Sequence, residues 1–130
     1  MNSFFSAFID KSISISTWLL DSGASHHMTD DKRELVEYED LSTPIYITMT
    51  NGQQLKAQVK GTVCCILENG RTVKLTELLH MPGLDKKLVS VAALTARGVL
   101  LQFKRDQAVL MSNDVIVAIL KRVGKLFRGM

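Results

Sequence analysis

Short runs in which apolar and polar residues alternate recur along most of this chain of 130 residues. The run Ser12–Ser16 alternates serine with isoleucine, and Ile45–Thr50 and Gln53–Val59 alternate on either side of Asn51-Gly52. A period of two is typical of a strand with one buried face. Because Asn-Gly fits the tight turn between two such strands, the pattern predicts a β-hairpin here and a half-buried or edge strand at Ser12–Ser16.

Further strands are predicted in the second half of the chain, where apolar runs flank polar turn residues. Val63–Leu67 pairs naturally with Thr72–Leu79, and Gln107–Met111 pairs with Val115–Leu120. Val99–Phe103 forms one more apolar run between these two pairs. Many short strands with turns at close intervals are typical of a small closed or orthogonally packed β-barrel.

One segment follows a different period. Between Lys86 and Arg97, apolar positions fall at i, i+3, i+4 and i+7 from Leu88, and Gly98 follows. This spacing predicts a helix that ends at the glycine. We assign its apolar stripe to core packing rather than to function. The predicted fold is therefore mostly β, with one late short helix.

A candidate for chemistry lies near the start, where Trp18–Leu20 runs directly into Asp21-Ser22-Gly23. The order predicts a buried strand that delivers a carboxylate into a tight turn. Burial disfavours a charged carboxylate unless other groups share the charge. Paired carboxylates that hold one proton and activate water use such a placement, although Asp-Ser-Gly also forms ordinary surface turns.

Composition is that of a soluble globular domain, with 46% hydrophobic and 22% charged residues. The longest apolar run, Val115–Leu120, is too short to cross a bilayer, so no membrane partner is expected. Residues 1–14 lack the basic start of a signal peptide. We interpret them as a lead-in, either flexible or a strand of a dimer interface, and residues 15–130 as one domain.

The net charge is +3, and part of it comes from a basic tail that contains Lys121, Arg122, Lys125 and Arg128. Such a tail could contact RNA, but a solvated charged end is the simpler interpretation. The tail lacks the interleaved aromatic residues of a single-strand-binding surface. Specific nucleic-acid binding is therefore not expected.

The sulfur and imidazole groups do not form an obvious metal or disulfide pattern. Cys64 and Cys65 are neighbours in a predicted strand, so they point to opposite faces and a disulfide between them is not expected. We expect one thiol to be buried and the other half-exposed, as in a protein of a reducing compartment. His26 and His27 are adjacent near acidic residues, but no third ligand is spaced to complete a metal site.

Three stretches together resemble one family, the protease of copia-type LTR retrotransposon polyproteins. Trp18–Met28 resembles its Asp-Ser-Gly signature, and Met81–Val91 resembles its second hallmark, a Pro-Gly-Leu followed by basic residues and a Leu-Leu-Ser-Val-like helix start. Lys121–Phe127 is similar to the glycine-basic-leucine-aromatic stretch that closes the same region. The resemblance extends from about Ser16 to the end of the chain.

The resemblance implies a retropepsin-like aspartic protease that cleaves a Gag-Pol polyprotein. It implies a homodimer in which each chain supplies one Asp21, without cofactor or metal, in the cytoplasm within a virus-like particle. The chain itself contains no second Asp-Ser-Gly or Asp-Thr-Gly. By analogy, Ser22 would hydrogen-bond across the twofold axis, and Gly23 would let the loop turn and the backbone approach substrate.

The same resemblance suggests where substrate binds. Thr48–Leu55 takes the place of the family's flap, a hairpin that closes over the peptide, and its tip carries a single glycine. Retroviral enzymes have acids after their alanine, whereas this chain has Ser25, His26 and His27. The expected substrate-binding residues are Ala24, Ser25, His26, Thr50, Asn51, Gly52 and Gln53.

Two other functions remain open at this point. The chain could be a catalytically silent retropepsin-fold domain that was retained for dimerisation or binding in a host-adopted or decayed element. A basic β-barrel that binds nucleic acid is the third interpretation, and it depends on the charge alone. Within the protease interpretation, Val99–Phe103 and the tail are expected to add strands to the dimer interface.

Overall fold

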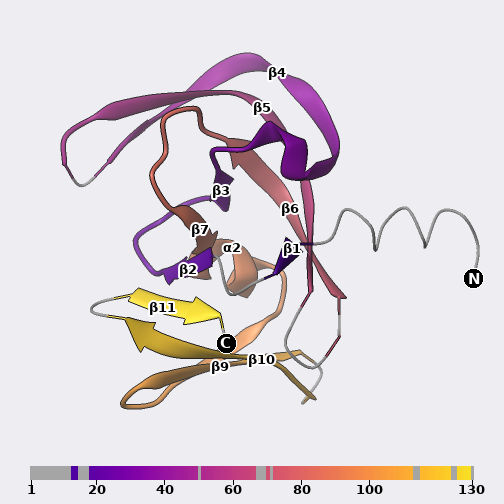
Figure 1. Ribbon diagram of the computed structural model, residues 1–130, viewed down its shortest axis with the longest axis vertical. Helices are drawn as coiled ribbons and strands as arrows, with labels where there is room; N and C mark the ends of the chain where they lie inside the picture. Colours follow the sequence, from indigo (N-terminus) through magenta and orange to yellow (C-terminus); the bar gives the residue numbers. More distant parts are fainter. Residues whose placement is uncertain are drawn as a thin grey trace, which may run out of the picture.

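The computed structural model describes residues 13–14, 18–49, 51–66, 70, 72–112, 115–123 and 126–129 (Figure 1). The described residues are mostly in strands, with one short α-helix late in the order, so the predicted fold class is confirmed. The elements are β1 (Ile13–Ser14), β2 (Trp18–Asp21), β3 (Met28–Thr29), the 3-10 turn η2 (Lys32–Glu34), β4 (Leu35–Thr48), β5 (Gln54–Ile66), β6 (Thr72–His80), β7 (Lys87–Ser90), α2 (Val91–Ala96), β8 (Leu100–Phe103), β9 (Gln107–Ser112), β10 (Val115–Val123) and β11 (Leu126–Gly129).

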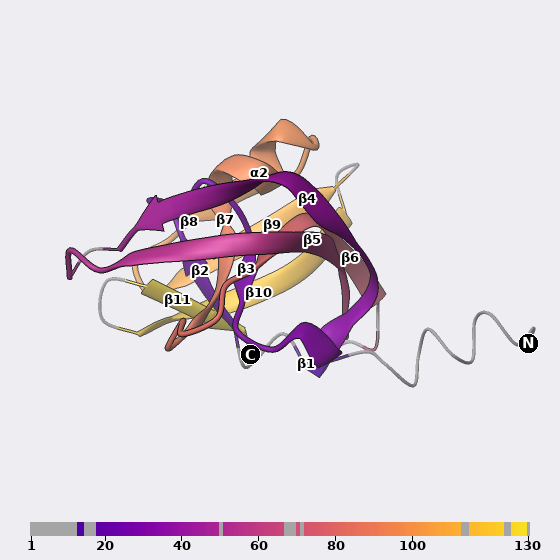
Figure 2. The ribbon, with the colours of Figure 1, turned by 90° about the horizontal axis from the view of Figure 1, so that it is seen from above.

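The strands form a single curved sheet in the order β1-β5-β6-β3-β7-β2-β11-β10-β9-β8, with β4 added beside β5. The β4–β5 hairpin arches over one end of the domain, and β9, β10 and β11 lie at the other end, with β2, β3 and β7 between them (Figures 1 and 2). Within the described strands, no pairing joins β8 to β1 or β4, so the sheet is barrel-like but open. Register shifts within β4 and β5 accompany the strong bend of these long strands.

The predicted hairpins are present. β4 and β5 pair up to Thr48 and Gln54, and Gly52 takes a φ of 85° in the turn between them, a conformation that favours glycine. β5 pairs with β6, and β9 pairs with β10, as the alternating runs predicted. The two turns predicted within these pairs are Glu68-Asn69-Gly70 and Ser112-Asn113-Asp114, and residues 68–69 and 113–114 of them lie outside the described residues, as does Leu67 at the end of a predicted strand.

The extent of the predicted helix was wrong. Leu88 and Val89 lie in β7, which pairs in parallel with Leu19 and Leu20 of β2. The helix α2 begins only after Ser90, whose side chain accepts a hydrogen bond from the Ala93 amide as an N-cap. Pairing with a buried strand therefore prevails over the helical period in the first half of the segment. The predicted stop is confirmed, because Gly98 has a φ of 83° directly after the last turn.

The strand β2 lies between two apolar clusters. Trp18 and Leu20 point into a cluster that includes Leu35, Val63, Leu75 and Leu78, whereas Leu19 points into one that includes Met28, Leu79, Met81 and Leu88. Each fully buried side chain of this size contributes roughly 1.5–3 kcal/mol through burial. The strand that precedes the Asp turn is thus fixed by packing on both faces.

The two cysteines differ from expectation. Both Cys64 and Cys65 are fully buried, rather than one buried and one half-exposed. The burial of β5 alternates near the hairpin but becomes continuous at Val63–Cys65, where the strand is covered on both faces. Burial raises the pKa of the Cys65 thiol to about 12, and the neighbouring Cys64 adds to this shift. Both groups therefore behave as small core residues.

The basic tail contributes a strand to the domain itself. β11 pairs with β10 on one side and with β2 on the other, with Phe127 opposite Leu20 and Arg128 opposite Leu19. Its neighbours on both sides thus come from the same chain. Among the described helices, none is long and apolar enough to cross a membrane.

Candidate active site

Asp21 is the last residue of β2, where the strand leaves the core. The three preceding residues are buried, Asp21 is half-buried, and Ser22 and Gly23 are exposed. The Gly23 amide donates a hydrogen bond of 2.8 Å to Oδ1 of Asp21. A carboxylate that accepts from the backbone of its own turn is held in a defined orientation, as the sequence pattern predicted for this position.

A cleft of about 300 Å³ opens beside this turn. One wall contains Asp21, Gly23, Ala24 and Ser25. The lining also includes Ile47, Thr48 and Met49 of the hairpin and residues 84–86, together with Met28 and Leu88. The candidate carboxylate, the end of the hairpin and several apolar side chains thus share one cavity.

The pairing of β2 with β7 brings the second hallmark stretch to this cleft. Asp21 lies opposite Ser90 at the ends of the two parallel strands, and Leu84, Asp85 and Lys86 from the loop before β7 line the same cleft as Asp21. In that loop, Leu84 is buried and its amide donates to the Met81 carbonyl oxygen. Two of the three sequence stretches that carry the resemblance, Trp18–Met28 and Met81–Val91, are therefore neighbours in space.

The expected substrate residues fall into separate groups. Ala24 and Ser25 line the cleft with Asp21, whereas His26 lines a different cavity of about 610 Å³ between the loop, β6 and α2. Asn51, Gly52 and Gln53 are exposed at the end of the hairpin and do not line the cleft. Both views show the hairpin projecting beyond the body of the domain (Figures 1 and 2). Thr50 lies outside the described residues.

Sequence reasoning missed several lining residues. Ile47 and Met49 were assigned to the hairpin only as strand residues, and Asp85 and Lys86 were not considered for the site. The break at Pro82-Gly83 before two charged residues was the signal that an exposed loop lies here. Its proximity to Asp21 depends on strand pairing distant in sequence, which no local pattern reveals.

Behind the cleft, the loop is anchored by a buried histidine. The Ser90 amide donates to Nδ1 of His27 over 2.9 Å, and the Ser90 hydroxyl donates to the Ala24 carbonyl oxygen over 2.7 Å. Burial, together with the neighbouring His26 and Arg97, lowers the pKa of His27 to about 4. His27 is therefore neutral at physiological pH and accepts through Nδ1.

Comparison with known proteins places this site in a family. Residues 18–99 match the family described as "Pol polyprotein, beta-barrel domain", which is more than half of the chain. The chain belongs to this family. The matched segment begins at Trp18, so it includes the Asp turn, the hairpin and the whole lining of the cleft.

Individual relatives of this Pol barrel domain are retrotransposon polyproteins. The chain is 31% identical over 91 residues to "Retrovirus-related Pol polyprotein from transposon RE1" of Arabidopsis thaliana, covering 69% of the chain and 6% of that polyprotein. It is 29% identical over 115 residues to "Retrovirus-related Pol polyprotein from transposon TNT 1-94" of Nicotiana tabacum, covering 87% of the chain and 8% of that polyprotein. The chain thus spans less than a tenth of these relatives. No solved structure matches it.

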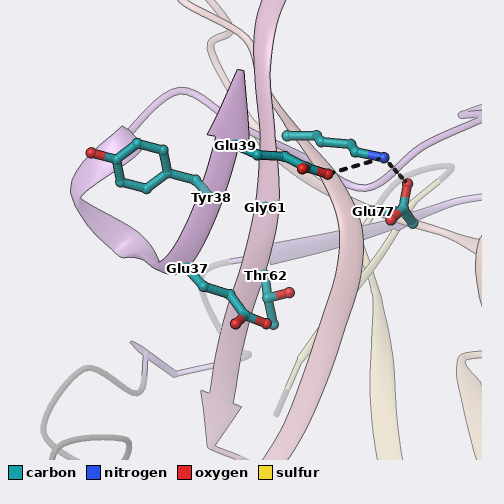
Figure 3. Close-up of a pocket in the computed structure, with 7 residues that line it drawn as sticks. Glu37, Tyr38, Glu39, Gly61, Thr62 and Glu77 are labelled. Carbon is teal, nitrogen blue, oxygen red and sulfur yellow. Dashed lines mark hydrogen bonds and ion pairs between the residues drawn. The ribbon is translucent and has the colours of Figure 1, made fainter. Parts of the chain in front are cut away.

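The Pol barrel domain also has a second, polar cleft of about 310 Å³ between β4, β5 and β6 (Figure 3). Nζ of Lys60 lies 3.0 Å from Oε2 of Glu77 and 3.5 Å from Oε1 of Glu39. Such exposed ion pairs contribute little to stability. Because this cleft contains three glutamates and a single lysine, it gives no support to nucleic-acid binding.

Proposed function

We propose that this domain is one half of a retropepsin-like aspartic endopeptidase that cleaves a retrotransposon Gag-Pol polyprotein. The observation that supports it most directly is the shared cleft, which is lined both by Asp21 and by Ile47, Thr48 and Met49 of the β4–β5 hairpin. A peptide lying in this cleft would be held between a positioned carboxylate and a hairpin that can exclude water. The site of action would be the cytoplasm, within a virus-like particle.

In the proposed mechanism, Asp21 and its counterpart from a second copy share one proton. One carboxylate removes a proton from water as it attacks the scissile carbonyl carbon, and the protonated partner donates to the carbonyl oxygen. Two carboxylates this close cannot both be charged, so mildly acidic pH would favour turnover. Ser22 is exposed beside Asp21, which leaves its hydroxyl available for contact across the axis.

The chain offers one competing source for the second carboxylate. Asp85 lines the same cleft, so a single-chain pair of Asp21 and Asp85 must be distinguished from two copies of Asp21. Mixed dimers separate the two cases. If wild-type and Asp21→Asn chains are combined in equal amounts and associate at random, only about a quarter of the dimers carry both carboxylates. A single-chain site would instead retain half of the activity.

The principal test is cleavage of a Gag-Pol precursor that contains the domain. Asp21→Asn should abolish processing while gel filtration and circular dichroism remain unchanged. Asp106→Asn is the matched control, because this aspartate is exposed in the turn between β8 and β9, away from the cleft. Processing by the Asp21→Asn precursor at the wild-type rate would refute the proposal. It would leave dimerisation or binding as the function of the fold.

A further inference from the structure

The loop that follows Asp21 returns to the core at His27, the most deeply buried polar residue of the Asp-Ser-Gly stretch. Only 4% of His27 is exposed, and its backbone oxygen accepts a hydrogen bond of 2.9 Å from the Leu79 amide. Its Nδ1 accepts from the Ser90 amide at 2.9 Å, across a sequence separation of 63 residues. His27 therefore connects the loop to β6 through its backbone and to β7 through its side chain.

This contact requires one protonation state. A backbone N–H can donate to Nδ1 only when that nitrogen carries no proton, so the imidazole must be neutral with its hydrogen on Nε2. Protonation would place two N–H groups against each other in a buried site. The charged and titratable groups around it are His26, Arg97 and Glu77, and Glu77 is paired with Lys60. Burial and the neighbouring His26 and Arg97 favour the neutral imidazole.

Ser90 is hydrogen-bonded both to His27 and to the Asp turn, so it links the two. Its hydroxyl donates to the Ala24 carbonyl oxygen at 2.7 Å and accepts from the Ala93 amide at 3.0 Å. Its backbone lies opposite Asp21 in the β2–β7 pair. Ser90 is itself fully buried, so these bonds cannot be replaced by bulk water without opening the core. Two hydrogen bonds thus hold the Asp turn: the Gly23 amide donates to the Asp21 carboxylate, and the Ser90 hydroxyl donates to the Ala24 carbonyl oxygen.

We propose that His27 is a positioning residue for Asp21, which holds the Asp turn through Ser90 only while its imidazole is neutral. The hydrogen bonds among His27, Ser90 and Ala24 do not depend on what the domain does, whereas the consequence for turnover rests on the proposed protease function. Acid would break the His27–Ser90 bond, release the Ala24 carbonyl oxygen and loosen the turn. The domain would therefore carry a lower pH limit separate from the titration of the paired aspartates.

The first experiment does not depend on catalysis. In the Asp21→Asn chain, which removes the titration of the aspartate, NMR would follow the His27 imidazole and the Ser90 and Ser25 amides as the pH is lowered. We expect both amides to shift with the same midpoint as His27, while amides of β9 stay unchanged. Amides that do not follow the imidazole would overturn the proposal, whatever the enzyme assay shows.

The second experiment uses two variants in the otherwise wild-type chain. His27→Asn keeps an uncharged side-chain acceptor, so it should retain turnover, whereas His27→Leu lacks the acceptor and should lose at least about tenfold in kcat. The ratio of kcat for His27→Asn to kcat for wild type cancels the titration of Asp21. Below the His27 midpoint, this ratio should rise by about tenfold for each pH unit. A ratio that stays constant with pH would overturn the positioning role.

The two experiments also separate this inference from the proposed function. If the precursor is never cleaved but the Ser90 and Ser25 amides follow His27, the protease proposal fails and the anchoring of the turn stands. If the precursor is cleaved but the chemical shifts of these amides do not change with the protonation of His27, the protease proposal is supported and the positioning role of His27 is refuted. His27→Leu need not fold for this decision, because the NMR titration uses the native histidine.

Discussion

Gly23 occupies the position where a side chain would first meet the candidate catalytic carboxylate. A Cβ at this residue would lie 3.3 Å from Oδ1 of Asp21, closer than about nine in ten Cβ contacts in proteins, so the carboxylate would have to shift. The φ of Gly23 is not positive, so the requirement for glycine here comes from space beside the carboxylate rather than from the turn itself. This differs from the role that the family resemblance suggested.

Gly23→Ala should therefore reduce turnover more than stability. The methyl group would push the Asp21 carboxylate from its hydrogen bond with the residue 23 amide, and a misplaced catalytic group costs on the order of tenfold to a hundredfold in kcat. Peptide cleavage and thermal denaturation would be measured on the same preparation. Gly70→Ala is the matched control, since Gly70 has a φ of 84° with open space around it. That variant should lose stability without loss of kcat.

His27 should also make folding stability depend on pH. Its pKa is lowered to about 4 in the folded chain, whereas it is near 6.5 when unfolded. The unfolded chain therefore binds more protons between these values, so the stabilisation is complete above 6.5 and is lost as the pH falls toward 4. From about pH 7.5 to about pH 4.5, wild type should lose roughly 2–3 kcal/mol more than His27→Asn in urea denaturation. Equal losses would show that His27 titrates normally in the fold.

At the level of elements, the sequence predicted hairpins better than the strand that supports the site. Asn51-Gly52 between two alternating strands is a strong local signal for a tight β-hairpin turn, and the hairpin forms as expected. Leu88 and Val89 satisfied a helical period as well as a buried strand, and only their pairing with β2 decides between them. Short apolar runs that are buried on both faces carry no period of their own.

A partly buried ion pair ties two of these elements together. Nζ of Lys87 on β7 lies 2.8 Å from Oε2 of Glu34, and the Thr29 hydroxyl donates to Oε1 of the same carboxylate. Their side chains are 25% and 10% exposed, so removal of one partner leaves the other group poorly solvated.

Glu34→Ala should therefore lower the free energy of unfolding by about 2 kcal/mol, because it leaves Lys87 and Thr29 without their acceptor. Urea denaturation of Glu34→Ala, Lys87→Met and the double variant would give the coupling energy between the two residues. Arg33→Met is the control, since the Arg33–Asp31 pair lies at the surface and its loss should leave stability unchanged. Additive effects of Glu34 and Lys87 would contradict this account.

At the level of the whole molecule, the carboxylate could be found from sequence but its surroundings could not. Asp21 follows a recognisable apolar run, so its position at the end of a buried strand was predictable. The cleft also needs Ile47 from the hairpin and Leu84 from the loop before β7, which are far from Asp21 in sequence. These residues meet only once β2, β4 and β7 have taken their places in one curved sheet, and that arrangement depends on pairings between strands far apart in sequence.

The same strand order changes the expectation for the C-terminal segment. The sequence suggested that the tail adds strands to a dimer interface, but β11 already pairs with β2 through Leu19 and Leu20. Truncation after Val123 would remove β11 and expose the edge of the strand that carries Asp21. Unpaired backbone groups in an otherwise buried strand are costly, so the loss should appear as unfolding rather than as simple dissociation.

We therefore expect the chain truncated after Val123 to melt at least about 10 °C lower than the full chain, with weaker β-sheet circular dichroism. The control is removal of Met130 alone, which leaves β11 (Leu126–Gly129) intact. Melting at several protein concentrations separates the two possibilities. Loss of a dimer contact would weaken or remove the concentration dependence of the midpoint that a dimeric full chain shows, whereas loss of an intrachain strand lowers the midpoint at every concentration. A truncated chain that stays folded as a monomer would instead place β11 in the dimer interface, as the sequence first suggested.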